Sequence, residues 1–514
     1  MRAIGSFAFL LAIVGSGCAG DRRAQAPECA LRAEMAAILA DYRLPGMTVA
    51  LAGPGGSVTV AGGLADREAG TPMTPGTTML AASIGKTFVA AAVLELSEAG
   101  ALDLDDFVGR WLGARPWFDR LPNARTITVR HLLQHRSGLP DYVRLPAFAE
   151  RWPHELAGAT PEDLIALTFE AGPLFPAGTN WSYTDTGYLL LGLLIEAVTG
   201  EPWGDVVRER FLMPLGLAST GRSDRPRLPG LACGYASPAS GLDLPPRTTD
   251  ARGELLWNPA VEGAGGGFYS TSRDLARWGQ AFLSGRLLAA DTWRQAIAGV
   301  PVSERDPDTR YGLGIAIRAS ARGPVLGHRG WIPGYVSSLA YYPEHDVAIA
   351  FQTNTDVGIV GHERPVVLEI EERLADVLIP QGAHASVPHS PVGAREPLVS
   401  CTGARRAGVR VEGSGPEGGR PDAGSGGETS WAPMSNFRSN QSPGAARRVG
   451  VQDWSGNARH RDACGIHGHR CGGAHHRHPA RGLRLARSDG CRGLSHASRG
   501  LEAARHRRIR PDAG

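Results

Sequence analysis

The chain has 514 residues, of which 42% are hydrophobic and 20% are charged, and its formal net charge is +3. This length allows two or three domains and a large apolar core. The charge is uneven, because residues 1–400 carry 34 basic and 42 acidic side chains, a net of −8, whereas residues 401–514 carry 20 and 9, a net of +11. The acidic body shows no basic cluster of the kind that binds nucleic acid, so we predict no nucleic-acid partner.

The N-terminus resembles an export signal. An apolar run at 4–14 and small residues at 15–17 precede Cys18, and the run is too short to span a bilayer stably. We therefore predict a signal peptide at 1–18, a linker at 19–29, and a protein of the cell envelope or periplasm. Two outcomes remain open: a lipid anchor on Cys18, which would be the chain's only membrane contact, or simple secretion.

Apolar spacing predicts the elements of the body. They are, in chain order, a helix at 31–42, hairpin strands at 47–52 and 58–61, helices at 88–96, from 161 onwards, at 189–198 and at 275–283, strands at 314–318, 324–328, 335–342 and 347–352, and a helix at 365–378. Strands at both ends of a helix-rich middle favour one sheet built from the two ends of the chain. We predict an α/β domain at 30–382 with a helical insert at about 105–290 and a cleft between the two lobes.

The C-terminal segment has a different composition. Residues 383–514 are rich in Gly, Arg, His and Ala, contain four of the seven cysteines, and show no sustained apolar period, so they cannot bury a core. We predict a low-complexity basic tail, either naturally disordered or encoded out of frame; resequencing that finds an intact frame past codon 400 would exclude the second. Its cysteines and histidines match no zinc-site spacing, so no metal is predicted there.

One serine and one lysine carry the clearest chemical signal. Lys86 is the only lysine, so the other 53 of the 54 basic side chains are arginine, and it stands three residues after Ser83. Arginine keeps its proton near neutral pH, whereas a buried amine can act as a base. A serine hydroxyl becomes a nucleophile only when a neighbour takes its proton, and an i,i+3 pair shares one helix face. The spacing predicts a Ser-x-x-Lys nucleophile; the alternative is a capping serine with an exposed lysine.

Further motifs follow this pair in a fixed order. They are TVRHLLQHRSGLPDY at 128–142, NWSYTDTGY at 180–188, YGLG at 311–314 and GHRGWIPGY at 327–335. The ordered set resembles the serine β-lactamase-related family, which includes class C β-lactamases, penicillin-binding DD-peptidases, D-aminopeptidases and family VIII esterases. The resemblance covers about residues 30–380. It implies a β-lactamase/transpeptidase-like fold, with an antiparallel sheet from both chain ends and helices on both of its faces.

The resemblance also implies roles for single residues. Ser83 would be acylated, Lys86 would take or share its proton, and Tyr183 would relay a proton to the leaving group. The backbone N–H groups of Ser83 and Trp331 would form the oxyanion hole. The substrate-binding positions implied are Asp185, His328, Gly330 and Trp331.

Two departures from the family pattern bear on the substrate. The usual Tyr-x-Asn ends in Asp185 here, and an ionised Asp only accepts hydrogen bonds, whereas Asn also donates them. The Lys-Thr-Gly strand of class C β-lactamases is His328-Arg329-Gly330, and histidine is a weaker anchor for a β-lactam carboxylate at neutral pH. Neighbours on a strand point to opposite faces, so we expect Arg329 to point away from the site. Both departures favour peptidase or esterase chemistry.

The sequence thus predicts an exported serine hydrolase that forms an acyl-enzyme on Ser83. Its substrates would be small esters, or amide and peptide bonds such as those of D-Ala-D-Ala-type cell-wall peptides; no metal or organic cofactor is implied. The alternatives are a class C-like β-lactamase and a catalytically silent scaffold that binds peptidoglycan or a partner protein through the same cleft. His131 and His135 have the spacing of zinc ligands, but Leu132 occupies the base position, so we interpret them as part of a structural helix. The glycines at 263–267 are expected to line the cleft.

Overall fold

The computed structural model describes residues 22–379, apart from gaps at 153–155, 157, 239–241, 243, 304–305 and 361–365. The predicted signal peptide at 1–18, including Cys18, and the basic tail at 383–514 lie outside the described residues. Within the part described, no helix is long and apolar enough to cross a membrane.

Helices and strands alternate in long blocks along the chain. The helices are α1 (Arg22–Asp41), α2 (Gly85–Glu98), α3 (Gly109–Leu112), α4 (Val129–Leu133), α5 (Pro146–Arg151), α6 (Pro161–Ala166), α7 (Asp185–Thr199), α8 (Trp203–Val207), α9 (Gly263–Gly266), α10 (Ser272–Phe282), α11 (Ala290–Ala296) and α12 (Val366–Leu378), with short 3₁₀ turns at η1 (Ala82–Ile84), η2 (Phe118–Arg120), η3 (Tyr142–Arg144) and η6 (Pro259–Glu262) and a π turn at η4 (Arg208–Leu212). The strands are β1 (Gly46–Gly53), β2 (Gly56–Asp66), β3 (Thr71–Pro72), β4 (Met79–Leu80), β5 (Gly221–Arg222), β6 (Phe268–Ser270), β7 (Val300–Ser303), β8 (Asp306–Tyr311), β9 (Ala316–Ser320), β10 (Gly323–Ile332), β11 (Tyr335–Tyr342) and β12 (Val347–Thr353).

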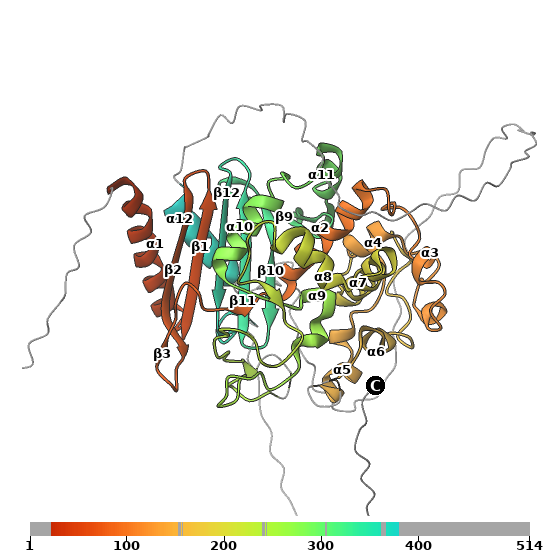
Figure 1. Cartoon of the computed structure of the whole chain (residues 1–514), viewed down its shortest axis with the longest axis horizontal. Coiled ribbons are helices and arrows are strands. Elements are labelled where there is room, and N and C mark those ends of the chain that lie inside the picture. Colours follow the sequence, from red (N-terminus) through yellow and green to blue (C-terminus); the bar gives the residue numbers. More distant parts are fainter. Residues whose placement is uncertain are drawn as a thin grey trace, which may run out of the picture. The chain divides into compact units, whose positions relative to one another are not determined.

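The main sheet joins the two ends of the described chain, as predicted. Its order is β3-β2-β1-β12-β11-β10-β9-β8-β7, and its strands pair antiparallel (Figure 1). Strand β1 lies beside β12, with Met47 opposite Thr353. A smaller sheet, β4-β6-β5, was not predicted.

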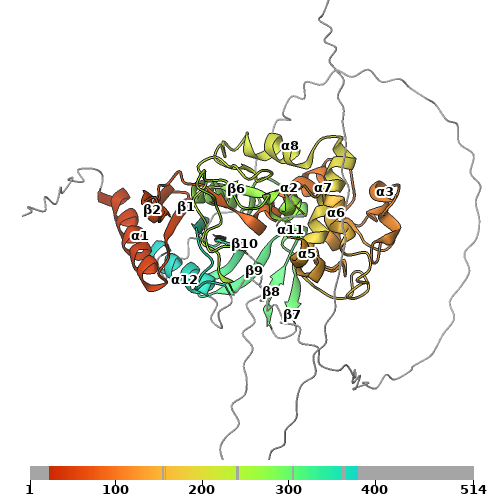
Figure 2. The same cartoon turned by 90° about the horizontal axis from the view of Figure 1, so that it is seen from below.

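Helices cover both faces of the main sheet. Helices α1 and α12 pack on one face, and α10 packs on β1 and β12 from the other (Figures 1 and 2). Helices α3 to α9 fall within the stretch predicted as a helical insert, but α10, which also falls there, packs on the sheet. As a packing unit, the helical part therefore ends before α10.

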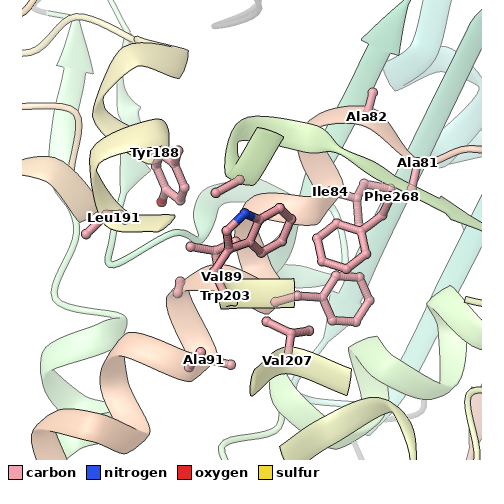
Figure 3. Packing of buried hydrophobic residues seen from close by; sticks show 14 of the residues in the cluster. Ala81, Ala82, Ile84, Val89, Ala91, Tyr188, Leu191, Trp203, Val207 and Phe268 are labelled. Carbon is pink, nitrogen blue, oxygen red and sulfur yellow. The ribbon is translucent and has the colours of Figure 1, made fainter. Parts of the chain in front are cut away.

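Helix α2 carries the predicted Ser-x-x-Lys lysine and is buried nearly all round. Such helices are held by core contacts on every side. The Phe88 ring lies 4.9 Å from that of Phe268 and 4.4 Å from that of Trp278, centroid to centroid. In Figure 3, Trp203 and Phe268 lie in the same buried cluster as Ile84. The core therefore fixes the start of α2, and with it the residues that precede it.

The structure corrects one sequence expectation and adds two strands to the main sheet. Helix α1 begins at Arg22, so the predicted linker at 19–29 is helical from that residue onwards. The first turns of α1 contain no large apolar residue and therefore give no periodic signal, but an existing helix can extend through such residues. The prediction also missed β7 and β8. Strand β7 contains Pro301, which a sheet tolerates at an edge, and β7 is an edge strand.

Candidate active site

Ser83 lies in the tight turn η1 directly before α2. Ala82, the residue before it, has a φ of +47°, a left-handed conformation that costs on the order of 1 kcal/mol or more in a non-glycine residue. A Cβ on Gly266 would stand 2.9 Å from the carbonyl carbon of Ala82, so α9 packs against this turn at backbone distance. The turn is thus held in a strained conformation at the predicted nucleophile, as is common for functional residues.

Lys86 is fully buried one turn away, and its amine contacts three acceptors. Its Nζ lies 3.2 Å from Ser83 Oγ and also donates to Asp185 Oδ1 and to the backbone carbonyl of Gly265. A lysine ammonium has three N–H donors, whereas the neutral amine has two. The ion pair with Asp185 and the donation to the Gly265 carbonyl match an ammonium, and Ser83 Oγ, which can donate as well as accept, lies where it can give its proton to Nζ.

Asp185 begins α7 and belongs to a cluster of three acids. Its backbone N–H donates to Asp141 Oδ1 at 2.9 Å, and Glu262 lies at the end of η6. Burial raises the pKa of Asp141 to about 7 and that of Glu262 to about 8, and in both the negative charge of Asp185 adds to the rise. Sequence reasoning missed Asp141 and Glu262 as site residues. Asp141 stands in a motif quoted for the family resemblance, but Glu262 is a single acid before a glycine run.

Tyr183 covers the amine of Lys86. The centroid of its ring lies 4.8 Å from Nζ, and its buried hydroxyl makes no hydrogen bond of normal geometry to any described residue. Burial raises the pKa of Tyr183 well above its usual value, the charge of Asp185 raises it further, and the nearby Ser83 hydroxyl acts in the opposite direction. The phenol therefore keeps its proton in the resting site.

His135 holds the segment that carries Tyr183. Its backbone carbonyl accepts from Ser182 N–H at 3.0 Å, its Nδ1 accepts from Thr184 N–H at 3.2 Å, and its ring lies 4.2 Å from the Tyr183 ring. Helix α4 ends at Leu133 and His135 has a φ of +57°, so the expectation that both histidines lie on one helix was wrong for His135. A left-handed residue cannot continue a right-handed helix.

His131 lies within α4 and caps it. Its Nδ1 accepts from Thr128 N–H at 3.3 Å, which is a structural contact, as the sequence suggested. Nowhere in the described ranges do three or more His, Cys, Asp or Glu side chains form a group that could hold a metal ion.

Strand β10 brings His328 against the site in a neutral form. His328 Nδ1–H donates to the Arg329 carbonyl at 2.7 Å, so Nε2 accepts from the Tyr311 hydroxyl at 2.9 Å. Burial, reinforced by the positive charge of Lys86, lowers the pKa of His328 to about 3. The position that holds lysine in class C β-lactamases therefore presents no positive charge here.

The next residues of β10 alternate between the two faces of the sheet. Arg329 Nε donates to Glu371 of α12 at 2.7 Å, which confirms that its side chain points away from Ser83. Trp331 Nε1 donates to Asp356 at 2.8 Å, so the indole is engaged away from the lysine. Between them, a Cβ on Gly330 would stand 2.2 Å from the Ala81 carbonyl oxygen. The backbone of β10 therefore passes directly against the turn that carries Ser83.

A cavity of about 210 Å³ lies beside this group. Of the seven predicted site residues, five line it and two, Lys86 and Gly330, are buried behind it. The five are Ser83, Tyr183, Asp185, His328 and Trp331. The structure thus brings the predicted residues together around one cavity, and it adds Asp141, Arg144, Trp181 and Tyr311 to the lining.

The neutral state of His328 predicts a pH-dependent stability. Unfolding lets this imidazole take up a proton below its ordinary pKa of about 6.5, so its contribution to folding is complete above pH 6.5 and is lost as pH falls towards 3. The free energy of unfolding of the wild type relative to His328→Gln should fall by about 2 kcal/mol between pH 7 and pH 5. Denaturant titrations of both proteins at the two pH values measure this, and a constant difference would mean that the pKa of His328 is the same in the folded and the unfolded protein.

Comparison with known proteins places this geometry among related folds. A family model described as Beta-lactamase matches residues 31–371. Penicillin-binding protein 4* of Bacillus subtilis (strain 168) is 28% identical over 285 residues, which are 54% of this chain and 60% of that protein, so the chain spans less than two thirds of that relative. Esterase EstB of Burkholderia gladioli is 28% identical over 341 residues, covering 60% of this chain and 85% of EstB. A crystal structure of a D-stereospecific amidohydrolase from Streptomyces sp. superposes with a TM-score of 0.57 at 30% identity, covering 66% of this chain and 97% of that chain.

Proposed function

The chain belongs to the Beta-lactamase family and is a serine hydrolase, and we propose that it hydrolyses small esters and amides that carry no carboxylate beside the scissile bond. Penicillins and peptides that end in D-Ala-D-Ala do carry such a carboxylate, so they would be poor substrates. The esterase and amidohydrolase names of two similar proteins support this substrate class.

The charge on the cavity side of β10 carries the proposal. A substrate carboxylate needs a cation, but His328 is neutral and Arg329 is paired with Glu371 on the other face of the sheet. Besides Arg329, three further arginines line the cavity, and one of them, Arg318, is paired with Glu371 at 2.6 Å. Arg144 pairs with Asp141 at 3.3 Å, and Arg310 donates to the Gly299 carbonyl. The cavity is therefore better suited to neutral or cationic acyl donors.

The chemistry proposed for these residues proceeds through an acyl-enzyme. Ser83 Oγ attacks the carbonyl carbon while its proton goes to Lys86, and the tetrahedral oxyanion is stabilised by the backbone N–H groups of Ser83 and Trp331. One such donor contributes about 3 kcal/mol to lowering the barrier. The leaving group departs with a proton that Tyr183 relays to it. Water then releases the acyl group by the reverse sequence.

Export is part of the proposal and rests on the N-terminal pattern of residues 1–18. The exported protein would either carry a lipid anchor on Cys18 or be secreted without one. Cell fractionation of the full chain tests it. Recovery of the protein in the cytoplasm alone would contradict export, and detergent-phase partitioning that Cys18→Ser abolishes would identify the anchor.

A substrate panel tests the activity itself. We expect kcat/KM for p-nitrophenyl butyrate, or for D-phenylalanine amide, to exceed that for benzylpenicillin by at least about a hundredfold, since a missing charge partner in a buried site costs about 3 kcal/mol. Ser83→Ala is the matched control, and its rate of substrate hydrolysis should equal the rate in buffer without enzyme. Rapid penicillin turnover would favour a β-lactamase instead. Trace activity that is unchanged in Ser83→Ala would favour a silent binding scaffold.

A further inference from the structure

The resting state of Lys86 poses a chemical requirement that the activity must meet. Its amine donates to Ser83, Asp185 and the Gly265 carbonyl, which uses all three N–H bonds of an ammonium. An ammonium has no lone pair and cannot take the proton of Ser83. One proton must therefore leave Lys86 before the first bond to the substrate forms.

The contacts of Nζ point to the group that receives this proton. A serine hydroxyl is the group that must lose a proton in the reaction, and a peptide carbonyl such as that of Gly265 is far too weak a base. The remaining contact, Asp185 Oδ1, is a carboxylate oxygen in direct contact with Nζ. The Asp185 side chain is 14% exposed and the Lys86 side chain is fully buried, so water has little access to the pair.

Two further carboxyl groups, those of Asp141 and Glu262, surround Asp185. Carboxylates that share a buried site repel each other, so one of them readily takes a proton. The pKa values of Asp141 and Glu262 are already raised to about 7 and about 8, in part by Asp185. The titratable and charged groups that face the Lys86–Asp185 pair from the elements around it are Asp141, Arg144, Glu262, His135, His328, Tyr142, Tyr183, Tyr188 and Tyr311.

We propose that Asp185 is the proton acceptor that converts Lys86 from an ammonium into the amine base. The proton passes from Nζ to Oδ1, and rotation about the Cε–Nζ bond turns the lone pair towards Ser83. As the Oγ–C bond forms, the Oγ proton goes to Nζ and the carbonyl π pair moves to oxygen. As the bond to the leaving group breaks, that proton goes on to the leaving group. Water repeats the sequence, and Asp185 keeps its proton until the resting site reforms.

This inference rests on the proposed hydrolase activity, and the pH dependence of Asp185→Asn tests it. In the wild type the exchange between Lys86 and Asp185 leaves the number of bound protons unchanged. In the variant the amine forms only by losing a proton to water. The ratio of wild-type to variant kcat/KM for p-nitrophenyl butyrate should be about thirtyfold near pH 7 and fall about tenfold per pH unit towards pH 8.5. Asp141 and Glu262 also titrate in this range, and loss of the Asp185 charge lowers their pKa values, so the Asp141→Asn variant is needed to separate their contribution.

The opposite sign would overturn the proposal. If Asp185 merely holds Lys86 by charge, removing that charge eases the loss of the Lys86 proton, and Asp185→Asn should match or exceed the wild type at neutral pH. Asp141→Asn is the matched control, because it removes a nearby carboxyl that does not touch Nζ; its ratio should not fall tenfold per pH unit. Asp185→Glu should restore the wild-type profile in part.

Two further observations keep the test decisive. Circular dichroism checks that Asp185→Asn is folded, and Asp185→Ser replaces it if it is not, with the same expected pH dependence. A wild type that cleaves no ester or amide of the panel would reject the proposed function. An active wild type with a flat ratio would reject only the role of Asp185.

Discussion

Replacing Lys86 by arginine is expected to lower kcat/KM by at least about a thousandfold, even though the positive charge is kept. The guanidinium does not lose a proton near neutral pH, so it cannot accept the proton of Ser83 at any step. It also presents a planar set of donors in a fully buried site built around one nitrogen with three acceptors. Steady-state hydrolysis of the ester by wild type and Lys86→Arg measures the loss.

A matched exchange at the surface controls for the chemistry of the swap. Arg110 is 63% exposed and pairs with Asp106, four residues earlier in the chain, so Arg110→Lys should leave kcat/KM within about twofold, because exposed ion pairs contribute little. If Lys86→Arg kept more than a tenth of the wild-type rate, Lys86 would serve only as a charge. Both its assignment as a base and the proton acceptor role of Asp185 would then be wrong.

The parts of the fold that the sequence predicted are those with a strong local pattern. The β1–β2 hairpin, the buried part of α2 and strands β10 to β12 each contain a run or an alternation of apolar residues that pack into the core. Pairing of β1 with β12 followed from having strands at both chain ends. Strand β7 was missed because it is short and contains Pro301, and α1 was begun too late because the sequence of its first turns contains no large apolar residue.

The site was predicted only as far as its motifs reach. Ser83 and Lys86 are three residues apart, so their contact follows from helix geometry. The third acceptor of Lys86 does not, because it is a backbone carbonyl, that of Gly265, 179 residues away. The same holds for Glu262 and for His135. Glu262 enters the site, and His135 accepts hydrogen bonds from the residues on either side of Tyr183, only because distant loops meet in the fold. The neutral state of His328 depends on its burial, and burial cannot be deduced from the order of residue types alone.

Gly330→Ala is expected to reduce kcat by several hundredfold, a loss comparable to removing an oxyanion-hole donor, with a smaller change in KM. The added Cβ would stand 2.2 Å from the Ala81 carbonyl oxygen and 2.4 Å from Ser337 Oγ, well inside contact distance. Either β10 or the turn before Ser83 must shift, and each is proposed to carry one oxyanion-hole N–H group. Overpacking of this kind also costs about 1–3 kcal/mol of stability, so thermal unfolding must be recorded beside the kinetics.

A second variant tests whether the loss comes from the approach of the two backbones or from the contact between the new Cβ and Ser337 Oγ. Ser337→Ala in the Gly330→Ala background removes the contact at 2.4 Å, together with the hydrogen bond that Ser337 Oγ donates to the Ala81 carbonyl, but the contact of the new Cβ with that carbonyl at 2.2 Å remains, so activity should stay low. Recovery in the double variant would mean that the hydroxyl, and not the approach of the two backbones, decides the effect. Gly55→Ala adds a Cβ where nothing lies within 4 Å, in the exposed turn between β1 and β2, and should leave kcat unchanged. A loss of kcat in Gly55→Ala as well would point to general instability. An unchanged kcat in this control would tie the effect of Gly330→Ala to the close approach of β10 and Ser83, on which the proposed oxyanion hole depends.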